Sequence, residues 1–181
     1  MVPGMLYGQS KKKGSDDESH MIDATIVRVH QHATTVITRM NQGEESMGLS
    51  KGGRTTKIHA LVDALGNPLE IILTEGNRHD VTQAKPLLEG RESKNVIADK
   101  GYDSNELRNY LEASGRTPII PPRAGRLDDI EYDSHTYRER NLVERFFAKI
   151  KHYRRVATRF EAKSYLYRAM IVLASIMIWL R

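Results

Sequence analysis

The sequence predicts a mixed α/β domain in which helices cover both faces of a five-stranded sheet. Three observations lead to this prediction. The first half of the chain contains three β-rich segments, two of them joined by a tight turn. Short apolar strands then alternate with capped helices, and two long helical segments end the chain. Antiparallel strands followed by alternating strands and helices are typical of a mixed sheet with helices on its faces.

The first three strands are rich in β-branched and apolar residues. They are expected at 22–29, 57–63 and 69–74. Gly66, Asn67 and Pro68 separate the last two and predict a hairpin. Before these strands, residues 1–20 mix glycine, serine and opposite charges without periodicity. We therefore expect a disordered arm at 1–20 and one domain over 21–181.

Helices and strands alternate in the second half. Asp80 and Ser104 are expected to cap helices that run to about residue 88 and over 105–113. Short strands are expected at 95–99 and 117–120, and final helices at 137–156 and 165–180, with the polar stretch 123–135 as a loop. The predicted order is therefore β-β-β-α-β-α-β-α-α.

One polar stripe follows the helix expected at 137–156. Tyr137, Arg140, Glu144 and Lys151 are offset by three, seven and fourteen residues, so at about 100° per residue they lie within roughly 60° of one another. The opposite flank is apolar, as in an amphipathic helix. A lone carboxylate among a tyrosine and two cations indicates a site where a metal meets a phosphate.

Composition excludes some functions and favours others. Lys and Arg outnumber Asp and Glu by 28 to 23, which favours a polyanionic partner, and the basic residues concentrate between Arg138 and Arg159. The absence of cysteine excludes disulfides, thiolate zinc sites and cysteine nucleophiles. No signal peptide is evident, and the uninterrupted apolar part of the last helix covers about a dozen residues, short of the ~20 that a membrane helix needs. We expect a cytoplasmic protein with no membrane role.

Two local motifs are misleading. The segment GLSKGGRT at 48–55 differs by one residue from a phosphate-binding loop, but that loop needs a preceding strand and a following helix, whereas a strand follows here. The HTYR segment at 135–138 matches the HxxR of tyrosine recombinases, a mainly helical family that five strands argue against.

Three carboxylates and their surroundings resemble a known family. Asp23 lies in the first strand, Asp99 ends the fourth, and Glu144 belongs to the polar stripe. The strings IDATIVRVH and VIADKGYDS, the spacing Tyr137-x2-Arg140-x3-Glu144-x6-Lys151, and the stretches GLSKGGRTTKIHALVDALGNPL and RRVATRFE resemble the DDE transposases of bacterial insertion sequences in the insertion sequence five and four groups.

The resemblance implies a ribonuclease-H-like fold in which Asp23, Asp99 and Glu144 are catalytic and hold two divalent cations, Mg²⁺ or Mn²⁺. Asp63 and Asp103 compete with Asp99, which we choose because it directly ends the apolar strand. Two hard cations on carboxylates can activate the nucleophile and stabilise the leaving oxygen of an in-line phosphodiester displacement. In the family, water first frees a 3′-hydroxyl, which then attacks target DNA.

Further residues are expected to contact DNA. Tyr137, Arg140 and Lys151 share the stripe of Glu144, although Arg140 and Glu144 could also form a simple i,i+4 salt bridge. The remaining candidates follow this stripe or occupy the second strand and the loop after the third: Arg154, Arg155, Lys57, His59, Arg78 and His79. For the histidines a hydrogen-bonded structural role is an equal alternative.

The resemblance also implies partners and a location. These are the DNA of the element ends and of the target, a second copy in an active homodimer, and the nucleoid region of the bacterial cytoplasm. Family members usually carry an upstream helical DNA-binding region, whereas about 20 residues precede the first strand here, so we expect a catalytic-domain portion. Two functions follow: an active transposase, or an inactive remnant that inhibits by binding DNA or by dimerising.

Overall fold

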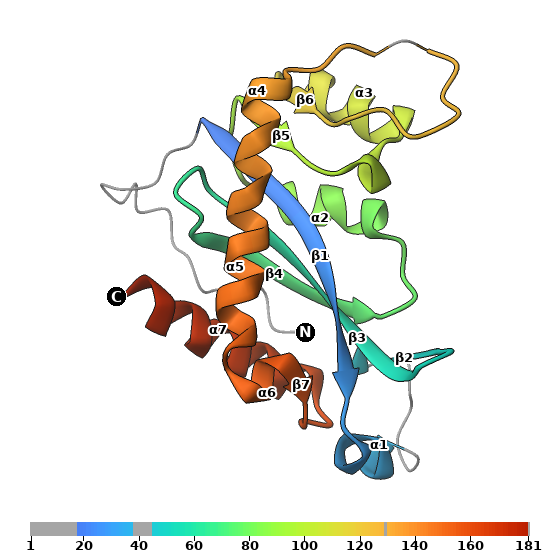
Figure 1. The fold of residues 1–181 in the computed structure, drawn as a ribbon, viewed down its shortest axis with the longest axis vertical. Helices are drawn as coiled ribbons and strands as arrows, with labels where there is room; N and C mark the ends of the chain where they lie inside the picture. Colours follow the sequence, from blue (N-terminus) through green and yellow to red (C-terminus); the bar gives the residue numbers. More distant parts are fainter. Residues whose placement is uncertain (1–17, 38–44, 129, 181) are drawn as a thin grey trace.

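A single mixed sheet forms the centre of the protein (Figure 1). The computed structural model describes residues 18–37, 45–128 and 130–180. Its strands are β1 (Ser19–Val29), β2 (Gly48–Ser50), β3 (Gly53–Val62), β4 (Pro68–Glu75), β5 (Asn95–Ile97), β6 (Thr117–Ile119) and β7 (Thr158–Arg159). Strands β4, β3, β1, β5 and β6 lie side by side in that order, while β2 also pairs with β3, and β7 with β1.

Helices cover both faces of this sheet. They are α1 (Gln31–Ile37), η2 (Asp80–Gln83), α2 (Ala84–Leu88), η3 (Lys100–Tyr102), α3 (Asn105–Ala113), α4 (Ser134–Tyr137), η4 (Arg138–Arg140), α5 (Asn141–Lys151), α6 (Arg154–Ala157) and α7 (Ser164–Trp179), the η elements being 3₁₀ turns. In Figure 1 the orange column from α4 to α5 runs in front of the sheet, with α6 and α7 below it.

The predicted α/β class is confirmed. Strands β1, β3 and β4 pair antiparallel, and β5 and β6 add parallel to β1, which is the mixed sheet expected of a ribonuclease-H-like fold. The five expected strands are present, and the described residues add two short ones, β2 and β7. Strand β2 folds back on β3 with Ser50 opposite Gly53, whose φ of 103° favours glycine.

The predicted helix over 137–156 has the wrong bounds. Its first turn, α4, begins at Ser134, within the stretch expected to be loop, because the Asp133 carboxylate accepts hydrogen bonds from the backbone N–H groups of His135 and Thr136. The 3₁₀ turn η4 then leads into α5, and the extended backbone of Tyr153 separates α5 from α6.

The start of the chain also differs from expectation. The short helix α1 directly after β1 was not predicted. Strand β1 begins at Ser19, two residues before the expected start of the domain, and residues 1–17 of the predicted arm lie outside the described residues.

The two faces of the sheet have separate apolar cores. Because side chains alternate along a strand, Met21 and Val27 of β1 point to one face and Ile22 to the other. The first face packs under α5 and α7 with residues such as Phe146 and Ile171. The second face packs against α2 and α3. Asp23 follows the register of Met21 and therefore points to the α5 side.

Strands separate beside Asp23. Strand β5 pairs with β1 only over Ser19–Met21, and β7 only over Arg28–Val29. Met21 is the last residue of β1 that pairs with β5, and its partner is Ile97. Asp23 and Asp99 each follow these residues by two positions, so they lie just beyond the end of the β1–β5 pairing, on the same face. The fold therefore places these carboxylates where the sheet opens, at the carboxyl end of β5, which is where α/β sheets commonly bind ligands.

Candidate active site at the opening between β1 and β5

Asp23 is a mostly buried carboxylate. Its side chain is 17% exposed, and its Oδ1 accepts a hydrogen bond of 2.8 Å from the backbone N–H of Ala24. Burial raises the pKa of Asp23 to about 6, and the charges of Asp99 and Glu144 act in the same direction, against that hydrogen bond and Arg140. The carboxylate is thus held among other negative charges, a setting that favours a bound cation.

Asp99 is fixed by the turn that follows it. Its Oδ1 accepts a hydrogen bond of 2.8 Å from the backbone N–H of Gly101 and thereby caps η3. A Cβ atom on Gly101 would lie 2.9 Å from that same oxygen, so a larger residue would press on the carboxylate. A glycine is therefore favoured at position 101, because it leaves room for the carboxylate of Asp99.

Arg140 joins Glu144 to Asp23. Its Nη1 donates to Asp23 Oδ2 at 2.9 Å, and its Nη2 donates to Glu144 Oε1. The guanidinium carbon lies 5.9 Å from the centre of the Tyr137 ring, within range of a cation–π contact. Three of the four residues of the predicted stripe thus gather around the carboxylate of β1.

Lys151 makes a second link between α5 and β1. Its Nζ donates to Thr25 Oγ1 at 2.5 Å, and burial lowers the pKa of the lysine. Thr25 is two residues from Asp23 and therefore shares its face of the strand. The sequence analysis did not single out Thr25, since a threonine in a strand carries no distinguishing signal.

The carboxylates suit a hard cation chemically, but an arginine lies between two of them. In the ranges that the structure describes, no group of three or more His, Cys, Asp or Glu residues is arranged so as to hold a metal ion. The guanidinium of Arg140 binds oxygens of both Asp23 and Glu144. Carboxylate oxygens are the ligands that Mg²⁺ prefers.

Two expected DNA contacts, Lys57 and His59, are buried. The Nζ of Lys57 donates to Asp80 Oδ1 and to the backbone carbonyl of Arg78, both at 2.6 Å. The Nε2 of His59 lies 2.8 Å from Thr74 Oγ1, and burial lowers its pKa to about 4. Neither side chain can reach DNA in this structure, because the face of β3 that they occupy is covered by η2 and α2.

Four other expected DNA contacts are exposed. Arg78 and His79 are exposed before η2, and Arg154 and Arg155 are exposed on α6. Arg154 lies over the Phe160 ring at 5.9 Å, and Arg155 is 3.6 Å from Glu161.

One residue near the site, Tyr102, was missed by the sequence analysis. Tyr102 follows Asp99 by three residues and is fully buried, and its hydroxyl has no hydrogen-bond partner among the described residues. Burial raises the pKa of Tyr102, and the charges of Asp80, Asp23 and Asp99 add to this effect. The string VIADKGYDS contains this tyrosine, but its burial could not be predicted from the string.

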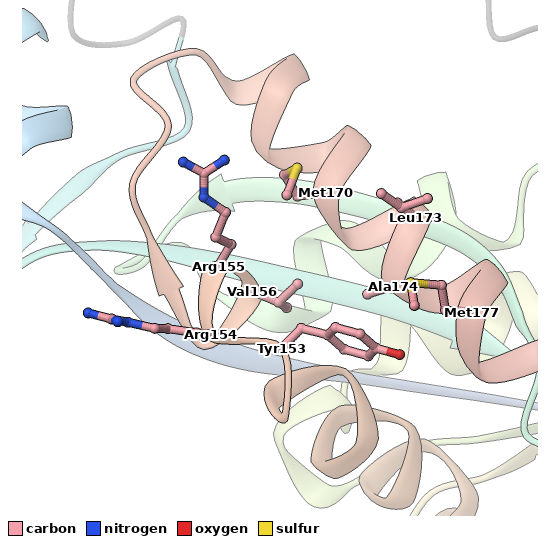
Figure 2. A pocket seen from close by; sticks show the side chains of 8 residues that line it. All are labelled: Tyr153, Arg154, Arg155, Val156, Met170, Leu173, Ala174 and Met177. Carbon is pink, nitrogen blue, oxygen red and sulfur yellow. The ribbon is translucent and has the colours of Figure 1, made fainter.

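A groove lies beyond the C-terminal end of α5, the end opposite Arg140. Figure 2 shows the side chains that line it, between α6 and α7. Its volume is about 250 Å³. Its lining is mostly apolar and consists of Tyr153, Arg154, Arg155, Val156, Met170, Leu173, Ala174 and Met177. None of the three carboxylates belongs to it. Within the described ranges, no helix is long and apolar enough to cross a membrane.

The fold defines a mixed α/β protein of the ribonuclease-H-like kind, with Asp23 lying where β1 and β5 separate. The family model described as "Transposase DDE domain" matches residues 15–179. The chain therefore belongs to the DDE transposase domain family, whose members cleave DNA, transfer strands and generally use divalent metals. The predicted family is confirmed.

Individual relatives agree with this assignment. The chain is 41% identical over 132 residues to the transposase assigned to insertion sequence element IS6501 of Brucella ovis, a match that covers 70% of this chain and 99% of that protein. It is 34% identical over 135 residues to the one assigned to IS402 of Burkholderia cepacia, covering 68% of this chain but 62% of that protein. Among solved structures, the piggyBac transposase synaptic complex with hairpin DNA matches with a TM-score of 0.42 and 14% identity, over 64% of this chain and 26% of that one.

Proposed function

We propose that this chain cleaves DNA and transfers its strands at the opening between β1 and β5, with Asp23, Asp99 and Glu144 as the catalytic residues. The observation that supports this most directly is that one guanidinium, that of Arg140, binds both Asp23 and Glu144. Asp99 lies two residues beyond the pairing of β5 with β1, on the face of the sheet that carries Asp23.

The three carboxylates would hold two divalent cations, Mg²⁺ or Mn²⁺. When bound, these cations would supply an activated oxygen nucleophile and stabilise the leaving oxygen. The chain's own residues supply the rest. Asp99 is oriented by the N–H of Gly101, and the bond between Lys151 and Thr25 holds α5 against β1.

DNA would follow the exposed cations. Arg154 and Arg155 are exposed on α6, and Arg78 and His79 are exposed before η2. Tyr137, Arg140 and Lys151 would contact phosphates closest to the carboxylates. We further propose that the DNA comprises the element ends and a target in the bacterial nucleoid, and that a homodimer forms in the active complex.

Replacing Asp99 tests the assignment. We expect Asp99→Asn to lower Mg²⁺- or Mn²⁺-dependent nicking of supercoiled DNA by about a hundredfold or more, since even indirect support of a metal ligand is worth 10–100-fold. Glu112→Gln on the exposed face of α3 is the matched control and should retain full activity. If Asp99→Asn nicks DNA as fast as the unmodified chain, Asp99 is not catalytic.

A further inference from the structure

Arg140 lies where two carboxylates from distant parts of the chain meet. It belongs to η4, whereas Asp23 lies on β1, 117 residues away. One guanidinium nitrogen binds an oxygen of Asp23 and the other an oxygen of Glu144. Asp99 attracts the same guanidinium electrostatically. The positive charge is therefore surrounded by all three proposed catalytic carboxylates.

An ordinary helical salt bridge does not account for this arrangement. The spacing of four residues explains the contact between Arg140 and Glu144, which alone would contribute only a few tenths of a kcal/mol. It does not explain the bond of 2.9 Å to Asp23 on another element. Asp23 is 17% and Arg140 21% exposed, so this second bond is poorly screened by solvent.

The carboxylate oxygens that bind Arg140 cannot at the same time bind a divalent cation with full strength. The lone pairs of Asp23 Oδ2 and Glu144 Oε1 that accept the N–H groups of Arg140 are among those that a divalent cation would take. A guanidinium placed between the ligands also repels an incoming metal ion. Because arginine has a long side chain, it can leave the carboxylates without any movement of the backbone.

We propose that Arg140 is an exchangeable internal counter-ion. It holds Asp23 and Glu144 together while no metal is present, and it releases their oxygens when a divalent cation binds. The proposal rests on the proposed function, which assigns these carboxylates as metal ligands. Since coupling between two ligands of one site is reciprocal, removing the guanidinium must strengthen metal binding.

Metal affinity tests this directly. Mg²⁺ is titrated calorimetrically into the metal-free full chain and into Arg140→Gln, which is neutral and still forms hydrogen bonds. We expect Arg140→Gln to bind Mg²⁺ about tenfold more tightly, within the usual range of coupling between sites. Arg145→Gln removes an exposed cation on the neighbouring turn of α5 and should change the affinity by less than about twofold. Equal or weaker binding by Arg140→Gln would overturn the proposal.

Thermal unfolding provides a second readout. In EDTA, Arg140→Gln should melt about 3 °C lower than the unmodified chain, since the carboxylates then lose their counter-ion. Saturating Mg²⁺ should close this gap. A gap that persists in Mg²⁺ would show that Arg140 remains a structural bridge and would also overturn the proposal. Arg140→Lys retains the charge but cannot form the two-pronged contact, so its affinity should fall between the other two.

The outcomes separate this proposal from the proposed function. If neither the unmodified chain nor Arg140→Gln binds Mg²⁺, the assignment of metal ligands fails and the counter-ion proposal fails with it. If Arg140→Gln binds Mg²⁺ more tightly but the unmodified chain neither nicks nor joins DNA, the counter-ion role stands and the proposed function fails.

Discussion

At the scale of single residues, His59 shows how burial decides a role. Its side chain is fully buried on β3, and the charges of Lys57 and Asp80 have opposite effects on its pKa. Burial is the largest effect and lowers its pKa from 6.5 to about 4. The histidine is therefore neutral in the folded protein at neutral pH and bonds to Thr74, which makes it part of the interior.

This shift predicts a loss of stability in acid. Between about pH 6.5 and 4 the unfolded chain binds a proton at His59 and the folded chain does not, so stability falls as the pH falls through this window. The loss should reach up to about 3 kcal/mol at pH 4. Urea unfolding from pH 7 to 4 should show that His59→Gln lacks this part of the pH dependence. The exposed His79→Gln serves as control, and the same slope in all three proteins would contradict the prediction.

At the scale of elements, the position of α5 against β1 determines the site. Two polar links hold the helix there: Arg140, in the turn η4 that leads into α5, binds Asp23, and Lys151 at the end of α5 binds Thr25. The apolar side chains of α5, such as Phe146 and Ile150, pack on the same face of the sheet. The helix therefore presents Glu144 at a fixed place along the strand.

Removing one link should loosen this packing. Thr25→Val keeps the shape and strand preference of the side chain but leaves the partly buried ammonium of Lys151 without its acceptor. We expect a loss of about 1–2 kcal/mol in the free energy of unfolding, measured with urea. Thr117→Val, at an exposed position of β6, should change stability by less than about 0.5 kcal/mol. Equal effects of the two substitutions would show that the bond to Lys151 contributes nothing.

Local patterns predicted the elements better than their ends and surroundings. The β-branched and apolar residues of 22–29 and the turn at Gly66 predicted β1 and the pairing of β3 with β4, because both signals are short-range. The Asp133 cap was missed inside a polar stretch that lacks periodicity. Lys57 and His59 alternate as they would on an exposed face, and only the packing of η2 and α2 reveals that this face is covered.

In the candidate site, too, local features could be predicted and long-range contacts could not. Asp23, Asp99 and Glu144 were chosen because their surroundings resemble the motifs of a known family, and in the structure Arg140 binds two of them, Asp23 and Glu144. The contact between Arg140 and Asp23 spans 117 residues and depends on how α5 crosses the sheet, so no local pattern could predict it. The helical pattern suggested only the partner four residues away. The roles of these residues in catalysis remain predictions.

At the scale of the whole molecule, the net charge of +5 acts through its distribution. Arg154 and Arg155 are exposed on α6, which follows α5 in the chain, and Glu161 is the acidic partner that the structure gives to Arg155. If DNA binds along these cations, their contacts are with phosphates. Binding of this kind releases counter-ions and therefore weakens steeply as salt rises.

The salt dependence of DNA binding measures these contacts. Each phosphate contact contributes about 0.9 to the slope of log affinity against log salt concentration. Replacing both Arg154 and Arg155 with alanine should therefore lower the slope by up to about 2, measured by fluorescence anisotropy with duplex DNA in EDTA so that no cleavage occurs. Lys94→Ala removes an exposed cation beside β5, away from α6, and should leave the slope unchanged. If the double variant keeps the original slope, DNA does not follow α6, and the exposed Arg78 and His79 before η2 become the surface to test next.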